Sequence, residues 1–288
     1  MSHPSLLARA LVAYGAHLPD HPRKWWLHRK LRDALRVEVA GDHEVVRDGI
    51  RWRLTPSDYC HASLYWLGIK DKWEHLNLER LVPRDAVVLD LGANFGYYSV
   101  KIARRLSDKG KVYALEPNPT NHTRLVENVA LNGLENRISV HRLGVSDASG
   151  TLTMVDDPTN TGHALVSTAE GAFPIEVVTI DDFVESQGLD RLDVIILDVE
   201  GYEPRALRGA RRTIERFRPM VFVEFWPHVM SLQGTSVGAI ADELEAYGYV
   251  MFKPDRDRLQ PLGDLPQGDP GINVFSFHRD SIPPSVGS

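Results

Sequence analysis

The chain has 288 residues, of which 43% are hydrophobic, so it is long enough for one substantial core with an accessory segment but short for two full-sized domains. Its formal net charge of -6 provides no global basic field, which disfavours a protein that tracks nucleic-acid phosphates. The only cysteine, Cys60, excludes an intrachain disulfide, favours a reducing cytoplasm and is interpreted as a small core residue rather than a nucleophile.

The N-terminal region predicts two amphipathic helices. The first is predicted over residues 5–15. Its apolar run is interrupted by Arg9 and is shorter than the roughly 18 residues of a membrane span, so an amphipathic helix is favoured over a span. Residues 23–36 hold six Lys or Arg against one Asp, with tryptophans and leucines at helical spacing. We favour docking of this stripe on the main domain. The alternatives are a helix that binds a membrane surface and a helix that covers the substrate. A homodimer seeded by Trp25 and Trp26 stays open.

A β-hairpin is predicted next, over residues 44–54, with Asp48-Gly49 as a type I′ turn. Ser57 or Asp58 is expected to cap the following segment, which has an imperfect helical pattern as far as Leu78. Residues 1–80 are therefore predicted to form a cap segment of helices and one hairpin.

From Val82 onward, short apolar runs alternate with helical patterns, which is typical of buried parallel strands joined by crossover helices. We predict an α/β fold for residues 81–280: a Rossmann-like, mostly parallel seven-stranded sheet with helices on both faces. Gly133 and Gly248 are expected to end two helices, and the polar segment 156–174 is interpreted as an exposed insertion near the site. The predicted strands are 87–90, 112–116, 138–142, 194–198 and 221–225, with 249–252 and 274–277 as an antiparallel edge.

A glycine turn follows the first of these strands. Glycines let a ligand approach the backbone at the start of a helix, but the spacing here is G-x-x-x-G rather than the G-x-G-x-x-G of dinucleotide sites. Asp90, just before the turn, would repel a pyrophosphate and attract the ammonium and sulfonium charges of S-adenosylmethionine. The residues of this segment expected to bind that cofactor are Asp90, Gly92, Ala93, Asn94, Gly96, Tyr97 and Tyr98.

Two later strand ends are predicted to extend the cofactor site. Glu116 lies about 20 residues beyond Gly96, where a carboxylate accepts both ribose hydroxyl protons; Pro117 and Asn118 follow it. Ser146 and Asp147 are expected to accept from the adenine amine, although a plain turn would have the same composition. An acid that is merely exposed to solvent after a buried strand would explain Asp90 or Glu116 alone. It would not explain why both acids stand at the ends of neighbouring strands.

The fourth and fifth strands end in the predicted reaction site. Asp198 and Glu200 leave the fourth strand, and Glu224 and His228 follow the fifth, so all four can face one crevice. One of them is predicted to be the general base for a hydroxyl, with His228 slightly ahead because an imidazole titrates near neutrality. The alternative is that they hold Mg²⁺, but their spacing fits no strong metal signature and no metal site is predicted. Asp198 is also counted among the cofactor-binding residues.

Four stretches in the order VVLDLGANFGYYSV, VYALEPNP, LDVEGYEPRALRGA and VFVEFWP resemble the FkbM family of methyltransferases. The resemblance covers about half of the chain, from Val87 to Pro227, and the segment from Asp198 to Glu203 is its most specific part. It implies a class I methyltransferase fold, S-adenosylmethionine as donor, S-adenosylhomocysteine as product, and O-methylation of a sugar or natural product. Many members have a lysine where this chain has Ile196, which puts any role of that lysine in doubt here.

Two other function classes stay open. An NAD-type oxidoreductase also needs a glycine turn and a later acid, but Asp90 and the glycine spacing count against it. A non-catalytic nucleoside-binding module would not account for the polar residues at four strand ends. Asp198-Val199-Glu200-Gly201 also differs from the Asp/Asn-Pro-Pro-aromatic motif of nucleic-acid amino-methyltransferases, so a small-molecule hydroxyl is the favoured acceptor and no nucleic-acid partner is predicted.

Overall fold

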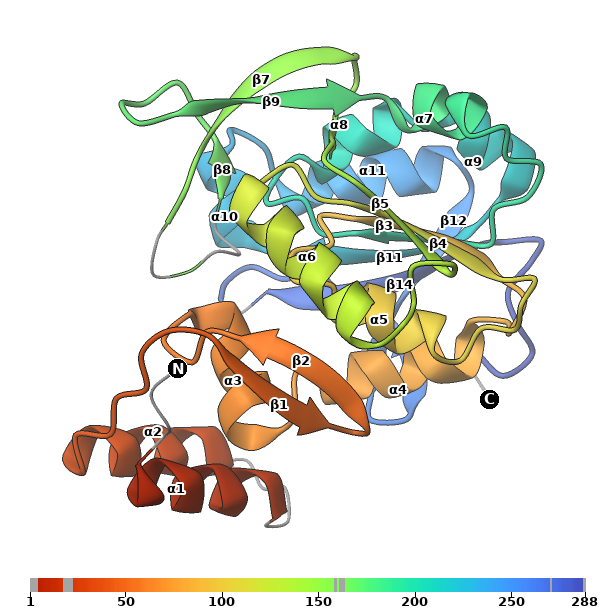
Figure 1. Ribbon diagram of the computed structural model, residues 1–288. Helices are drawn as coiled ribbons and strands as arrows, with labels where there is room; N and C mark the ends of the chain where they lie inside the picture. Colours follow the sequence, from red (N-terminus) through yellow and green to blue (C-terminus); the bar gives the residue numbers. More distant parts are fainter. Residues whose placement is uncertain (1–4, 18–22, 158–159, 161–163, 270, 287–288) are drawn as a thin grey trace. The chain divides into compact units, whose positions relative to one another are not determined.

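The computed structural model describes residues 5–17, 23–157, 160, 164–269 and 271–286. The chain divides into two compact units: an N-terminal unit of residues 1–72 with 156–163, and a main unit of residues 73–155 with 164–288 (Figure 1). The division into a cap segment (1–80) and a methyltransferase domain (81–280) stays a prediction, because compactness alone does not say which residues carry a function.

The N-terminal unit contains the predicted helices and hairpin. Asp48 and Gly49 both have positive φ, 50° and 69°, as a type I′ turn requires. Asp58 caps the next helix by accepting from the backbone N–H groups of Cys60 and His61. The elements are α1 (Leu6–His17), α2 (Lys24–Ala34), β1 (His43–Arg47), β2 (Ile50–Leu54) and α3 (Tyr59–Leu67).

The helical pattern up to Leu78 is two helices rather than one. Gly68 adopts the left-handed conformation, with φ at 73°, and ends α3. A new helix, α4 (Lys72–Leu81), begins after a short break and continues into the main unit. Cys60 is half-buried rather than a core residue, and its Sγ donates to Asn160 Oδ1 at 3.1 Å.

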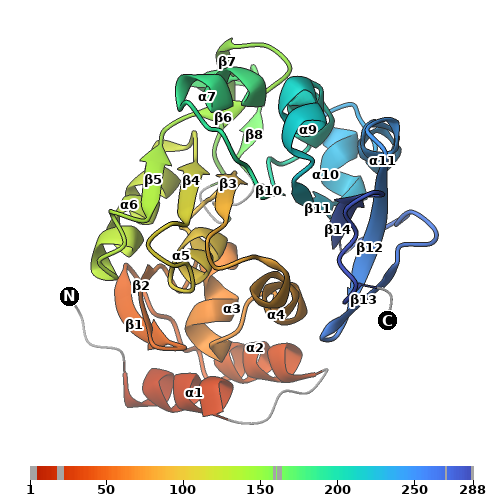
Figure 2. The ribbon, with the colours of Figure 1, turned by 90° about the vertical axis from the view of Figure 1, so that its right-hand side faces the viewer.

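The main unit is built on an eight-stranded mixed sheet, whose order β13-β12-β14-β11-β10-β3-β4-β5 can be followed across Figure 2. The strands from β11 to β5 are parallel, and β14, β12 and β13 pair antiparallel at one edge. All seven predicted strands are present, and β13 is an additional hairpin strand that the sequence did not suggest. The strands are β3 (Val87–Leu91), β4 (Lys111–Leu115), β5 (Ile138–His141), β10 (Val194–Leu197), β11 (Met220–Phe225), β12 (Tyr249–Asp255), β13 (Arg258–Pro261) and β14 (Ile272–His278).

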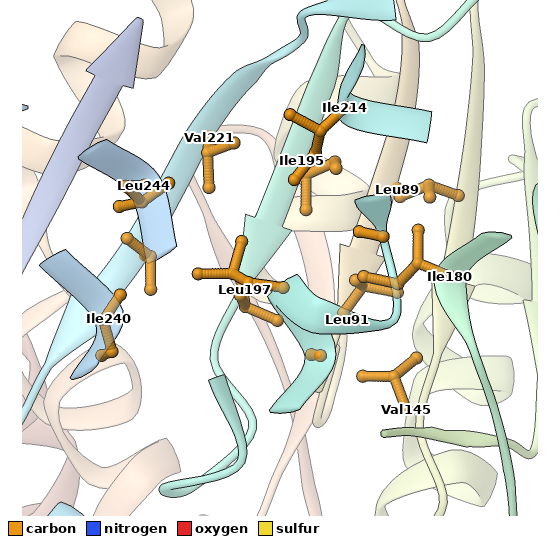
Figure 3. Packing of buried hydrophobic residues seen from close by; sticks show 14 of the residues in the cluster. Leu89, Leu91, Val145, Ile180, Ile195, Leu197, Ile214, Val221, Ile240 and Leu244 are labelled. Atoms are coloured by element: carbon orange, nitrogen blue, oxygen red, sulfur yellow. The ribbon is translucent and has the colours of Figure 1, made fainter. Parts of the chain in front are cut away.

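Helices cover both faces of this sheet. Odd-numbered residues of β3, β10 and β11, such as Leu89, Ile195 and Val221, pack against apolar side chains of α7, α8, α9 and α11 (Figure 3). Even-numbered residues point to the opposite face, where Tyr98 of α5 packs edge-on against Phe222. The remaining helices are α5 (Tyr97–Ala103), α6 (Pro119–Leu131), α7 (Ile180–Ser186), α8 (Glu203–Arg208), α9 (Arg211–Phe217), α10 (Pro227–Leu232) and α11 (Val237–Ala246).

Helix ends in the main unit follow the sequence signals. Gly133 and Gly248 stand in the left-handed conformation after α6 and α11, with φ of 63° and 81°. Pro204 lies in the first turn of α8, where its missing N–H costs nothing. No helix in the described part of the chain is both long and apolar enough to cross a membrane.

The segment predicted as an exposed polar insertion is in part a second sheet. Its strands are ordered β6-β9-β7-β8, and Met154, Ala164, Ile175 and Val177 form a small apolar cluster. The segment 156–174, predicted as an exposed insertion, thus contains β8 and the start of β9, two strands that the sequence analysis did not predict, while residues 158–159 and 161–163 lie outside the described residues. The four strands are β6 (Gly144–Val145), β7 (Gly150–Val155), β8 (Leu165–Val166) and β9 (Phe173–Val178).

Candidate functional site

The candidate site lies where the strand order of the main sheet reverses, between β3 and β10. These two strands are parallel neighbours, with Asp90 opposite Ile196 and Leu91 opposite Leu197. The chain leaves β3 toward β4 on one side, whereas β10 and β11 extend on the other. Such a reversal opens a crevice at the carboxyl ends of the strands, which is where ligands bind in open α/β sheets.

Gly92 forms the first part of the turn after β3. Its N–H and that of Ala93 donate to the carbonyl of Leu115, at 2.9 and 3.0 Å. Gly92 has a φ of 79°, and a Cβ there would lie 1.8 Å from the carbonyl oxygen of Asp198. The glycine is therefore required by the close approach of β10, in addition to any ligand.

Gly96 stands at the N-terminal cap of α5 with a φ of 91°. A Cβ there would lie 2.6 Å from the side chain of Leu125 in α6, so this glycine is needed for packing as well as for its conformation. The helix that follows begins at Tyr97, as the sequence predicts.

Asp90 is only 2% exposed and accepts a short hydrogen bond from the hydroxyl of Ser99. Its pKa is raised to about 6: burial is the main cause, the hydrogen bond from Ser99 opposes the shift, and the negative charge of Asp198 adds to it. The residue opposite Asp90 on β10 is Ile196, which is 1% exposed and carries no charge. The acid is therefore buried beside another acid and an aliphatic neighbour, rather than beside a basic one.

Glu116 connects the turn that follows β3 with the turn that follows β4. Its Oε2 accepts from the N–H of Asn94 at 2.8 Å, and its Oε1 accepts from the N–H of Asn118 at 2.9 Å. Burial raises its pKa to about 7, the two backbone bonds oppose the shift, and the charges of Asp198 and Asp90 add to it. Each carboxylate oxygen keeps acceptor capacity for a further donor, such as a ribose hydroxyl.

Asn94 and Asn118 have different surroundings. Asn94 has a positive φ of 49°, and its buried Oδ1 has no hydrogen-bond partner, so it can accept from a ligand. Asn118 caps α6 by accepting from the N–H groups of Thr120 and Asn121, and Pro117 before it is half-buried. Asn94 thus has an unused acceptor, whereas the side-chain oxygen of Asn118 is already used.

Tyr97 and Tyr98 are 4% and 8% exposed. Their rings meet edge-on at 5.2 Å, Lys101 Nζ lies 5.3 Å from the Tyr97 centroid, and Tyr98 packs against Phe222 at 5.3 Å. Both rings therefore belong to the packing of the sheet, and their contact with a cofactor stays a prediction.

Ser146 and Asp147 form a fixed turn after β6. The N–H of Ser146 donates to the carbonyl of Val178 at 3.1 Å, and its hydroxyl donates to Asp147 Oδ1 at 3.1 Å. Asp147 also pairs with Arg208 at 3.5 Å, and a Cβ on Gly209 would lie 2.3 Å from the Ser146 carbonyl oxygen. These contacts explain the turn without a ligand, so its role in binding adenine stays a prediction.

Asp198 directly follows β10 and influences the other acids electrostatically. Its negative charge raises the pKa values of Asp90, Glu116, Glu200 and Glu203. Together with Glu224, whose charge raises the pKa of Glu200, these residues form what we call the carboxylate cluster. Its members are Asp90, Glu116, Asp198, Glu200, Glu203 and Glu224.

Glu200 stands in the left-handed region with a φ of 52°. Its Oε2 is buried and has no hydrogen-bond partner. Burial, followed by the charges of Asp198 and Glu224, raises its pKa well above the ordinary value. A non-glycine residue in this conformation costs free energy, and such residues concentrate at functional sites.

Glu203 belongs to the cluster but was not among the site residues predicted from the sequence. It is 1% exposed, accepts from the N–H of Val199 at 2.9 Å through Oε1, and leaves Oε2 without a partner. Burial raises its pKa to about 8. Its place in the segment from Asp198 to Glu203, the most specific part of the family resemblance, was a signal that could have singled it out.

His228 differs from the buried acids in its exposure to solvent. It is exposed in the first turn of α10, and its backbone carbonyl accepts from the hydroxyl of Ser231 at 2.7 Å. Its role as a base stays a prediction. In the described part of the chain, no group of three or more His, Cys, Asp or Glu side chains is placed to hold a metal ion.

The geometry suits a ligand that carries positive charge and hydroxyl donors. Burying several carboxylates together is unfavourable until a cation joins them. Asn94 and Glu200 each present a buried oxygen without a partner. S-Adenosylmethionine, with its ammonium, sulfonium and ribose hydroxyls, fits this donor set.

Comparison with known proteins gives curated relatives with stated activities. The chain is 30% identical over 131 residues to the hexuronic acid methyltransferase AglP of Haloferax volcanii; the match covers 46% of this chain and 52% of AglP, so about half of that relative's length. It is 26% identical over 212 residues to the 2-O-methyltransferase NoeI of Sinorhizobium fredii, covering 65% of this chain and 84% of NoeI. A shorter match, 33% identical over 89 residues, covers 31% of this chain and 21% of a tRNA (guanine(37)-N(1))-methyltransferase of Phytophthora infestans.

A family model decides the assignment. The model for the methyltransferase FkbM domain matches residues 90–251, which is more than half of the chain. This range begins at Asp90, includes the whole carboxylate cluster and ends within β12. The chain belongs to the FkbM methyltransferase domain family.

Proposed function

We propose that this protein transfers the methyl group of S-adenosylmethionine to a hydroxyl of a small molecule, a sugar or another natural product. The observation that carries the proposal is the carboxylate cluster at the reversal of the sheet, in which Asp198 raises the pKa values of four other acids. The names of two relatives support an oxygen acceptor on a sugar: NoeI is a 2-O-methyltransferase and AglP acts on a hexuronic acid.

The cofactor-binding side of the site is assigned from charge and hydrogen bonding. Asp90 and Asp198 provide negative charge for the ammonium and sulfonium groups. Glu116 and Asn94 offer acceptors for the ribose hydroxyls. When bound, S-adenosylmethionine supplies a methyl group on an excellent leaving group, so the protein's main task is to align the acceptor with it.

We assign the general base to Glu200, ahead of Asp198, Glu224 and His228. Burial raises its pKa, which makes its ionised carboxylate a stronger base than an ordinary one, and its buried Oε2 has no hydrogen-bond partner and can accept a proton. In its ionised form, Glu200 accepts the proton of the acceptor hydroxyl as the new O–CH₃ bond forms. The carbon–sulfur bond breaks with its electron pair remaining on sulfur, so the positive charge is neutralised as the proton is transferred.

The cofactor is tested by calorimetric titration of the full chain with S-adenosylmethionine, S-adenosylhomocysteine and NAD. We expect both methionine-derived ligands to bind and NAD to give no heat. Binding of NAD alone would support an oxidoreductase instead. Binding of the nucleosides without methyl transfer to any fraction of a cell extract would support the non-catalytic module.

The acceptor is tested with radiolabelled methyl donor and a cell extract divided into two portions, one of them treated with ribonuclease. We expect label in small, neutral or acidic molecules of both portions, because the cluster and the sequence Asp198-Val199-Glu200-Gly201 favour a hydroxyl. Label that disappears with ribonuclease would place the acceptor in RNA. Full activity in excess chelator is expected, since the proposed base needs no metal ion.

A further inference from the structure

The N-terminal unit contains a cavity of about 820 Å³ that the proposed methyl transfer does not use. Its walls come from α2, from the chain that follows it and from the start and end of α3. This volume lies within the range of small-molecule binding sites. The most prominent side chains lining it are Arg29, Arg32, Arg36, Tyr59 and Trp66.

Two of the three arginines are on α2 and the third follows it. Arg29 and Arg32 are three residues apart on the helix, which places them on one face, and Arg36 comes two residues after the last residue of the helix. Arg36 has a positive φ of 48°, where the chain leaves α2, and its backbone N–H donates to the carbonyl of Asp33 at 3.1 Å. Two arginines from the helix and one from the chain after it thus line the same cavity.

The central arginine rests on a fixed aromatic surface. The guanidinium carbon of Arg32 lies 5.5 Å from the ring centroid of Trp66. Trp66 is 1% exposed, and its Nε1 donates to the carbonyl of Pro56 at 3.2 Å. Stacking on a buried ring reduces the freedom of the guanidinium while its N–H groups stay available at the edges.

Two acids also line the cavity, and neither neutralises all of the arginines. Asp33 approaches Arg32 only to 3.9 Å, and Glu38 is exposed at the rim. In the described ranges, Arg29 and Arg36 make no ion pair with a carboxylate. Three cations against two anions leave a positive cavity in a chain whose net charge is -6.

We propose that this cavity binds a small molecule carrying an oxyanion, either a phosphate or a carboxylate. Guanidinium groups bind such oxyanions through paired N–H···O hydrogen bonds, and three arginines can surround one group. A concave, partly aromatic site suits a small molecule rather than a flat membrane surface. The proposal concerns the N-terminal unit alone and does not depend on the reaction assigned to the carboxylate cluster.

The test uses the full chain at low ionic strength and four probes: inorganic phosphate, glucose 6-phosphate, glucuronate and neutral glucose. We expect calorimetric binding of at least one anionic probe and none of glucose, with affinity that falls several-fold between about 50 and about 200 mM salt. Binding of both phosphate probes without glucuronate identifies a phosphate ligand, and the reverse result identifies a carboxylate. Absence of binding by all three anions would overturn the proposal.

Variants distinguish anion binding in the cavity from a general attraction of anions by the positive charge of α2. The double variant Arg29→Gln/Arg36→Gln removes two exposed, unpaired guanidiniums and should weaken binding by about tenfold. The matched control is Lys30→Gln, on the same helix and exposed but outside the cavity, which should change affinity less than about twofold. Circular dichroism confirms that both variants fold. Equal weakening in the control would overturn the assignment, because it would show that the charge of the helix, and not the cavity, attracts the anion.

Discussion

The carboxylate cluster of the main unit and the arginines of the N-terminal cavity are both groups of like charge, but they are built differently. The cluster stands at the ends of buried parallel strands, and Asp90, Glu116 and Glu203 are each at most 5% exposed. Arg29 on α2 and Arg36 just after it have exposed side chains. These three carboxylates have been moved out of water, whereas the two arginines keep contact with it.

This difference determines how each group responds to its conditions. Buried carboxylates shift their pKa values upward, because burial and mutual repulsion disfavour the ionised form. Exposed guanidiniums stay charged, and salt screens their attraction for an anion. We therefore expect function at the cluster to depend mainly on pH, and binding at the cavity to depend mainly on ionic strength.

The largest effect is expected from Gly92→Ala, which would break the close packing around the cluster. The new Cβ would lie 1.8 Å from the Asp198 carbonyl oxygen in a backbone conformation of φ 79°. We expect a loss of at least about 3 kcal/mol in the free energy of unfolding, measured in urea, together with loss of methyl transfer. The control is Gly188→Ala, where φ is 61° but no atom lies within 4 Å, so only about 1 kcal/mol should be lost. Equal losses in both variants would contradict the packing argument.

Asp198→Asn is expected to have the next largest effect, with opposite signs for activity and stability. Removing the charge that attracts the cofactor should lower kcat/KM by about a hundredfold, equivalent to about 2.7 kcal/mol. The ligand-free protein should become more stable at neutral pH, because the like-charge repulsion on Asp90, Glu116, Glu200 and Glu203 is relieved. The exposed residue Asp190 provides the control variant, Asp190→Asn. A parallel fall of activity and stability would indicate a structural role instead.

The stability of the ligand-free protein should fall as the pH rises from about 4.5 to about 8. Glu116 has a pKa raised to about 7 and Glu203 one raised to about 8, so the folded state holds protons that the unfolded state releases from about pH 4.5 upward. Glu116→Gln should reduce the total change in the free energy of unfolding over this pH range by about 3 kcal/mol. The slope with pH is the quantity to compare, because the variant also loses a hydrogen bond to a backbone N–H. The exposed Glu176→Gln should leave the slope unchanged.

The smallest effect is a fraction of a proton released when the cofactor binds near pH 7. A bound cation lowers the pKa values of partly protonated carboxyls such as Glu116, so protons leave and affinity increases with pH. Calorimetry in buffers with different ionisation enthalpies measures this release. S-Adenosylmethionine should release more than S-adenosylhomocysteine, because only the former has a sulfonium. Equal release by both ligands would mean that the cluster interacts with the ammonium alone.

The sequence predicted those parts of the fold whose signals are local. The buried parallel strand β10 is an uninterrupted apolar run, and β3 is apolar except for Asp90. The turn at Asp48-Gly49 is specified by its two residues. The second sheet was missed because β8 has only two residues and its pairing with β7 is not local. A signal for β9 was present, since Ile175 and Val177 alternate with Glu176 along the strand.

For the site, the sequence located the acids but not their protonation. Asp90, Glu116, Asp198 and Glu200 were predicted from their positions at strand ends, and the structure places them in one cluster. The raised pKa values depend on burial and on neighbours from several strands, which no short motif specifies. Glu203 was missed for the same reason, because its burial is a result of tertiary packing.

Glu116 joins the backbones of two loops, since its two oxygens each accept an amide N–H, from Asn94 and from Asn118. The two amides should therefore exchange their hydrogens with deuterated solvent at similar, slow rates, because one opening motion frees both. A ligand that contacts this carboxylate would slow both exchange rates at once. Recognition of the ribose and ordering of these loops would then be a single cooperative event.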